Sequence, residues 1–138
     1  MSKLTRENAL LPFQTNVDLT AYIGCAVLVG PSPNGATAEL WMTDEKPFGV
    51  IVHADPAIVT VAPFHGGVAG TFKVKILDET SPGRQLCLVD DNGTYGFADA
   101  SEQNFPGETF ICAVAVESGV AGEMIEAIPT KPESLTIA

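Results

Sequence analysis

The chain is 138 residues long and carries a formal net charge of −10, although only 17% of its residues are charged. This balance argues against a nucleic-acid partner, because phosphate binding needs clustered Lys and Arg and the seven basic residues are scattered. Thirteen glycines and ten prolines cut the sequence into short pieces, which predicts one all-β domain, a compact β-barrel or β-sandwich of short antiparallel strands.

Residues 1–17 are expected to form an extended N-terminal arm ahead of the domain. Leu10, Leu11 and Phe13 surround Pro12, which prevents a helix from running through this segment. An extended apolar arm packs either on a neighbouring molecule or back over its own barrel. We expect the neighbour, and the alternative stays open.

The domain itself is expected over residues 18–129, where short apolar runs alternate with turn residues. Asp18 is a good N-cap for a single helical turn, and Asn92-Gly93 is typical of a tight hairpin turn. Residues 110–116 show no polar alternation, which predicts a strand covered on both faces. Residues 130–138 are expected to form a loose tail. Strands are expected at residues 25–29, 38–42, 48–52, 58–62, 71–76, 85–89, 95–98, 110–116 and 124–128.

A glycine-rich tetrad occurs twice, as residues 67–70 and again as residues 119–122, with the identical sequence Gly-Val-Ala-Gly. Each copy has an apolar run before it and a strand-like run after it, which predicts two similar hairpins. The match is confined to the turns, because alignment of the tetrads sets Val74 against Glu126.

No catalytic or metal-binding signature is present, so we expect no enzyme activity, no cofactor and no metal. His53 and His65 do not stand at metal-ligand spacing, and there is no Cys-x-x-Cys. There is no nucleophile elbow and no phosphate loop. Paired carboxylates could be posed as acid and base, but most carboxylates in so acidic a chain are simply solvated. The pairs in question are Asp90 with Asp91 and Glu123 with Glu126.

The cysteines and the apolar runs bear on where the protein resides. Cys25, Cys87 and Cys112 are odd in number and lie in or beside apolar runs, which predicts buried free thiols. No apolar run approaches the roughly 20 residues that span a bilayer, and residues 1–7 lack the apolar core of a secretory signal. We therefore expect no membrane partner.

Several motifs together resemble the small capsid decoration (cement) proteins of tailed bacteriophages. The resemblance covers roughly residues 19–129 and consists of glycine-turn spacing. It rests on four segments. The first is residues 47–51 (Pro-Phe-Gly-Val-Ile), and the second is residues 66–71, which lead into Val74-Lys75. The third is Pro82-Gly83, followed by Leu86, Leu88 and then Asp91-Asn92-Gly93, and the fourth is residues 115–126. The chain departs from the pattern in its longer arm, its Pro31-Ser32-Pro33 loop and its tail.

The resemblance implies a β-barrel or β-sandwich that binds the outer surface of an assembled phage head and stabilises it. The implied partner is the major capsid protein, and the implied location is the outside of the virion, after synthesis in the cytoplasm of the bacterial host. A homo-oligomer is expected, with a trimer favoured because quasi-three-fold positions occur on capsid lattices. Leu10, Leu11, Pro12 and Phe13 are the expected contacts to the capsid or to a neighbouring subunit.

Two other classes remain open at this stage. A small β-barrel that binds a ligand or mediates adhesion would be favoured by an exposed aromatic cluster involving Tyr22, Trp41 or Tyr95. A small enzyme would be favoured by a polar pocket around His53 or His65 with carboxylates within reach.

Overall fold

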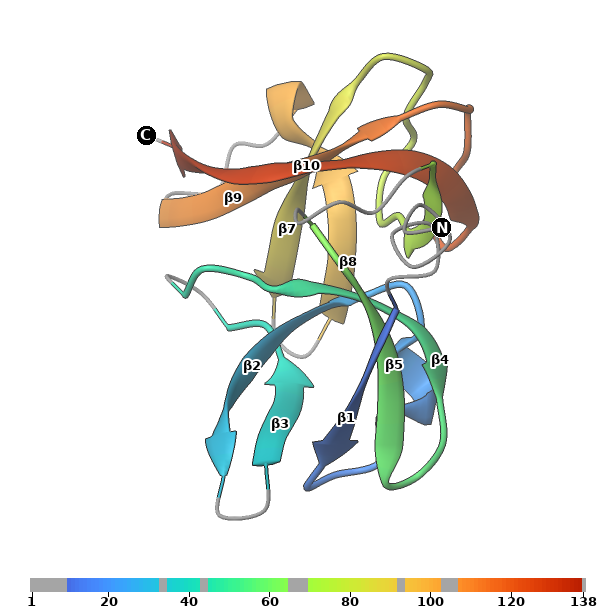
Figure 1. The fold of residues 1–138 in the computed structure, drawn as a ribbon. Helices are drawn as coiled ribbons and strands as arrows, with labels where there is room; N and C mark the ends of the chain where they lie inside the picture. Colours follow the sequence, from blue (N-terminus) through green and yellow to red (C-terminus); the bar gives the residue numbers. More distant parts are fainter. Residues whose placement is uncertain are drawn as a thin grey trace, which may run out of the picture.

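The structure is a computed structural model, and it describes residues 10–32, 35–42, 45–64, 70–91, 94–102 and 107–137. Within these residues the regular secondary structure is almost all strand, so the prediction of an all-β fold is confirmed (Figure 1). No helix among them is long and apolar enough to cross a membrane. The elements are β1 (Leu11–Thr15), the short 3₁₀ helix η1 (Thr20–Tyr22), β2 (Ala26–Ser32), β3 (Gly35–Leu40), β4 (Gly49–Ala54), β5 (Ile58–Pro63), β6 (Phe72–Lys75), β7 (Gln85–Asp91), β8 (Thr94–Asp99), a second 3₁₀ helix η2 (Ala100–Glu102), β9 (Gly107–Ala115) and β10 (Met124–Ile137).

The strands form two sheets that lie one above the other in Figure 1. The N-terminal half makes a closed barrel in the order β1-β3-β2-β4-β5, and the C-terminal half makes a five-stranded sheet in the order β6-β10-β9-β7-β8. The pairings are antiparallel except that β1 runs parallel to β3 and that a parallel bridge joins Ile76 to Phe97. The predicted helical turn is present as η1, but its N-cap is Leu19 and not Asp18. Asp18 lies one residue earlier, and its Oδ1 accepts a hydrogen bond from the Thr20 amide at 2.9 Å. That bond lowers the pKa of Asp18.

Three barrel strands are apolar on both faces because each face meets a different core. Val27, Ile51 and Val61 point into the barrel, while their chain neighbours Ala26, Val50 and Ala62 face the second sheet. Successive side chains of a strand point to opposite faces, so a strand between two cores needs a continuous apolar run. This explains why residues 25–29, 48–52 and 58–62 lack polar alternation.

The core between the two sheets is the larger of the two and joins them into one unit. Phe64 follows β5 and is 2% exposed. Its ring meets Phe72 edge-on at 5.9 Å and Phe97 at 6.3 Å. Trp41 turns into the same core just beyond the end of β3, and is 3% exposed. The two sheets are therefore packed as one body around a shared set of large side chains.

Only one of the two expected hairpins exists. β9 and β10 pair as a hairpin around the second glycine tetrad. The strands on either side of the first tetrad, β5 and β6, belong to different sheets, so that prediction is wrong. The tetrads still end alike, because Gly70 and Gly122 have φ angles of 90° and 91° and each precedes a strand by two residues. The strands that follow them, β6 and β10, pair with each other.

The boundaries expected at residues 17 and 130 differ from those of the structure. Leu11–Thr15, which we expected to lie in a separate arm, forms β1 and pairs with β5 and β3 of its own barrel. Residues 130–137, expected to be a loose tail, continue β10 to Ile137 and pair with β9 as far as Gly107. Backbone pairing in both segments overrides a sequence in which proline interrupts the strand pattern.

Candidate attachment surfaces and a polar pocket

The four residues expected to contact a capsid lie at the start of the barrel and are not equivalent. Leu10 is 45% exposed and Leu11 is 39% exposed, so both present apolar side chains to solvent. Pro12 is also exposed, opposite Thr60 of β5. Phe13 is half-buried, and its ring packs edge-on against Phe48 with centroids 5.5 Å apart. The first three residues are available to a partner, whereas Phe13 serves the barrel.

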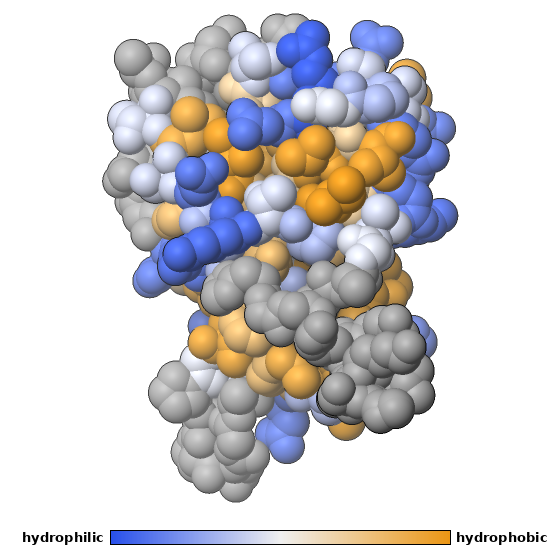
Figure 2. Space-filling view, turned by 45° about the horizontal axis from the view of Figure 1, so that its top comes forward, coloured by the Kyte–Doolittle hydropathy of each residue, from blue (hydrophilic) through white to orange (hydrophobic). Residues whose placement is uncertain are grey.

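A second apolar surface, which the sequence did not lead us to expect, covers the outer face of β9 and β10. Val116, Met124 and Ile128 are 39%, 37% and 45% exposed. Ile128 pairs with Val114, and the Val116 amide donates to the Glu126 carbonyl, so these side chains share one face of the sheet. Figure 2 shows hydrophobic side chains gathered on this half of the molecule between polar ones. Residues 124–128 are apolar at both odd and even positions except for Glu126. That pattern could have indicated that the solvent-facing side of this strand is also apolar.

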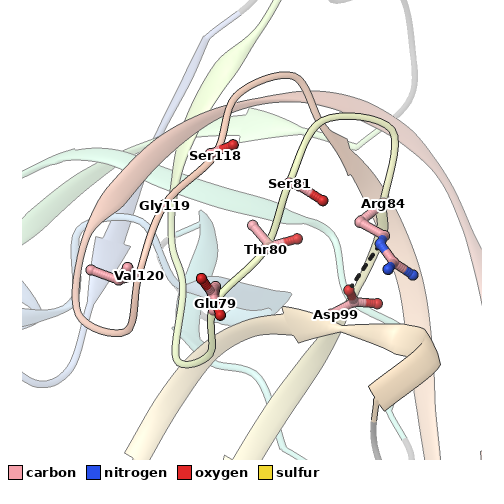
Figure 3. Close-up of a pocket in the computed structure, with 8 residues that line it drawn as sticks. All are labelled: Glu79, Thr80, Ser81, Arg84, Asp99, Ser118, Gly119 and Val120. Atoms are coloured by element: carbon pink, nitrogen blue, oxygen red, sulfur yellow. Dashed lines mark ion pairs between the residues drawn. The ribbon is translucent and has the colours of Figure 1, made fainter.

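The second sheet also carries a polar pocket of about 390 Å³ between the loop before β7 and the loop before β10 (Figure 3). The two loops are tied together by backbone hydrogen bonds in both directions between Thr80 and Gly119, at 3.0 and 3.2 Å. The lining residues are Glu79, Thr80, Ser81, Arg84, Asp99, Ser118, Gly119 and Val120.

An ion pair on the pocket wall fixes the end of β8. Arg84 Nε lies 3.5 Å from Asp99 Oδ2, and Asp99 is nearly fully buried. Asp99 Oδ1 accepts hydrogen bonds from the Ser101 amide at 3.0 Å and from its hydroxyl at 2.7 Å. Arg84 and Ser101 thus both hold the carboxylate, which stabilises this end of the second sheet. The Thr80 hydroxyl, from another residue that lines the pocket, is buried and has no hydrogen-bond partner among the described residues.

The histidines do not build a catalytic site within the part of the chain that the structure describes. His53 is exposed, and its Nε2 lies 3.7 Å from Asp55 Oδ2, away from the pocket. His65 lies outside the described residues, as do residues 66–69 and Asn92-Gly93. In the described ranges no three His, Cys, Asp or Glu side chains gather as metal ligands would.

All three cysteines are buried and free, as predicted. Burial raises the pKa of Cys25 to about 11 and that of Cys87 to about 12. It raises the pKa of Cys112 well above the ordinary value of 9.0. Because only the thiolate is a good nucleophile, thiols that stay neutral near pH 7 are packing groups.

The aromatic side chains that would mark a ligand-binding module are not gathered on the surface. Trp41 is buried, and its indole N–H donates to the Glu45 carbonyl. Tyr22 and Tyr95 are half-buried and meet edge-on with centroids 5.8 Å apart. Within the described part of the chain, the exposed cluster expected for a ligand-binding module is therefore not formed by these three residues.

No protein-family model and no curated protein matches this sequence. Among solved structures, the fold is similar to that of the head fiber gp8.5 N base in bacteriophage phi29, with a TM-score of 0.58. The match covers 90% of this chain and 95% of that chain at 11% sequence identity. At this identity the likeness is one of fold, and it extends over both sheets of the molecule.

Proposed function

We propose that this protein is a structural component of a tailed-phage head that binds the outer surface of the assembled capsid and stabilises it, without catalysing a reaction. The observation that carries the proposal is the fold shared with a phage head fiber base over nearly the whole of both chains. Folds host many functions, so fold alone is a weak guide. The support is stronger because the decoration-protein resemblance in the sequence points to the same part of the virion.

The surface of the molecule suits attachment better than chemistry. Exposed apolar side chains occur at the start of the barrel and on the outer face of β9 and β10. Burying such side chains against a shell contributes free energy without any reactive group, at about 25 cal/mol per Å². The polar pocket, in contrast, has its buried carboxylate engaged by Arg84 and Ser101.

Leu10, Leu11 and Pro12 remain our proposed contacts to the capsid or to a neighbouring copy. They are exposed at the start of the first strand of a rigid barrel, so little chain ordering opposes their burial. Several copies arranged around a symmetry axis would add their contacts through multivalency. A homo-oligomer is proposed for this reason, with a trimer favoured.

The proposal is tested by mixing the purified protein with undecorated heads of the phage that encodes it. We expect the protein to sediment with the heads, to give regular density outside the shell, and to raise the temperature at which filled heads release DNA. The density also reports the number of copies at each site. Heads that remain bare at micromolar protein would contradict the proposal.

A matched pair of variants tests the proposed contacts. Leu10→Ser combined with Leu11→Ser removes apolar surface at the start of the barrel, while Val17→Ser removes an apolar side chain beyond the end of β1 that is more exposed, at 60%. The double variant should bind heads about tenfold more weakly or worse, which corresponds to about 1.4 kcal/mol, and Val17→Ser should bind normally. Equal binding by both would remove these residues from the contact.

A further inference from the structure

The last strand of the chain is far longer than the strand that covers its outer edge. β10 has 14 residues and lies between β9 and β6. β6 has only four residues and pairs with Met124–Ala127 alone. Residues 133–137 pair with β9 on one side. On their other side no strand among the described residues pairs with them, and Figure 1 shows this end of β10 running outward with β9.

Among the described residues, the other edge strands of the second sheet, β6 and β8, each make a backbone hydrogen bond to another segment of the chain, while β9 pairs with β7 only as far as Ile111. The first sheet is closed and has no edge. At β6, the Lys75 amide donates to the Gly24 carbonyl at 3.0 Å. At β8, the Phe97 carbonyl accepts from the Leu77 amide at 2.8 Å. Native proteins cover or blunt sheet edges because a free edge templates pairing with another chain, so the long open edge of β10 marks a site of interaction.

The first part of this edge is blunted and the last part is not. Pro129 and Pro132 carry no N–H, and Lys131 is exposed between them, which are common devices against pairing. Beyond Pro132 the sequence is Glu133-Ser134-Leu135-Thr136-Ile137, which has no proline. On the other side of the β9–β10 hairpin, the Thr109 hydroxyl of β9 donates to the Leu88 carbonyl of β7 at 2.6 Å and so fixes the hairpin to the rest of the sheet. The open edge is thus presented by a supported strand.

We propose that residues 133–137 of β10 receive an extended segment of the shell protein, which adds to the second sheet as a further strand. The inference rests on the proposed function and deepens it by naming the contact. A row of alternating N–H and C=O groups selects a polypeptide in the β conformation, since only such a backbone offers the complementary spacing. A second copy is the less suitable occupant of this edge, because Glu133 already places a carboxylate on it and a copy of the same acidic strand would bring another. An uncharged or basic segment fits it.

Two adjacent prolines test the edge. Successive residues of β10 direct their N–H groups alternately to β9 and to the open edge. Ser134→Pro and Leu135→Pro should therefore differ in their effect. One of them removes a hydrogen bond to β9 and lowers the melting temperature. The other removes an N–H group that points to the open edge and leaves the melting temperature unchanged. The variant that preserves the melting temperature should bind undecorated heads at least about tenfold more weakly. Ser134→Ala and Leu135→Ala keep the N–H groups and should bind as the unmodified protein does.

Hydrogen exchange on the unmodified protein gives an independent measurement. The amides of residues 133–137 that exchange fastest in the free protein should slow at least about tenfold when heads are bound. If the protein binds heads but these amides remain fast and the edge proline has no effect, the inference is overturned while the proposed function stands. If both proline variants lower the melting temperature, the hydrogen-exchange result on the unmodified protein decides whether residues 133–137 receive a strand. If the unmodified protein does not bind heads, both proposals fall.

Discussion

At the scale of single residues, Gly49 shows how closely the barrel strands approach each other. It begins β4, opposite Pro63 of β5. A Cβ at this position would fall on the Ala62 carbonyl oxygen and would come within 2.7 Å of Val61 Cγ1. The obstacle is backbone in a closed barrel, so it cannot move aside as the end of a long side chain could.

We therefore predict that Gly49→Ala destabilises the protein by about 1–3 kcal/mol, the usual cost of forcing extra atoms into a packed interior. Gly30→Ala is the matched control, because Gly30 also lies in a barrel strand, has no positive φ, and would place its new methyl group more than 4 Å from any neighbouring atom. That change should alter stability by no more than about 0.5 kcal/mol. Urea denaturation of both variants measures the difference. Equal stabilities would mean that β4 and β5 are not this close.

Residue chemistry was partly predictable from the sequence. The three cysteines lie in apolar runs, and burial follows from that context alone. The ion pair between Arg84 and Asp99 was not predictable, since it depends on the end of β8 folding beside the loop before β7. The buried Thr80 hydroxyl has the same origin, because its surroundings come from a separate loop.

At the scale of elements, the strands found from the sequence are those whose pattern is local. Nine expected runs correspond to β2 through β10, although several boundaries moved. β1 was missed because Pro12 breaks its pattern and because its partners, Thr37 and Val59 among them, are far away in the sequence. The second half of β10 was missed because Pro129 and Pro132 suggested a tail, whereas β9 supplies a pairing edge beyond them.

We predict that β1 is needed for the stability of the barrel. Two truncations isolate it: one lacks residues 2–9 and the other lacks residues 2–15. Removal of β1 takes Phe13 from Phe48 and opens the barrel between β3 and β5, which exposes Val59 and Val61. Loss of that burial should lower the melting temperature of the longer truncation by at least about 10 °C relative to the shorter one. If the two truncated proteins melted at the same temperature, β1 would contribute nothing to the barrel, and this segment would be a separate arm.

At the scale of the whole molecule, the sequence predicted the class of fold but not its division into two sheets. Alternation and turn chemistry specify strands, and they do not specify which strands share a sheet. Residues 58–62 and 71–76 look like a hairpin across glycines, yet they belong to different layers. What joins the layers is a set of large side chains, Phe64 foremost, whose contacts lie far apart in the sequence.

That shared core predicts that the two sheets unfold together. Phe64 stands at the end of the barrel sequence and touches Phe72 and Phe97 of the second sheet, so Phe64→Ala removes contacts on which both depend. A loss of about 3–5 kcal/mol in the free energy of unfolding is expected when a buried phenylalanine is truncated.

Val59→Ala, which removes side-chain atoms from the barrel's own interior, is the comparison variant for Phe64→Ala. Fluorescence of Trp41, which reports the shared core, and far-ultraviolet circular dichroism, which reports all strands, should give one coincident transition in the unmodified protein and in both variants. Trp41 directly follows β3 and its amide donates to the Ala26 carbonyl of β2, so melting of the barrel would expose it. If Val59→Ala separated the two signals, with the Trp41 fluorescence changing before the remaining circular dichroism signal is lost, the sheets would be independent units. In that case only the second sheet would need to be folded for the β10 edge to pair with a shell.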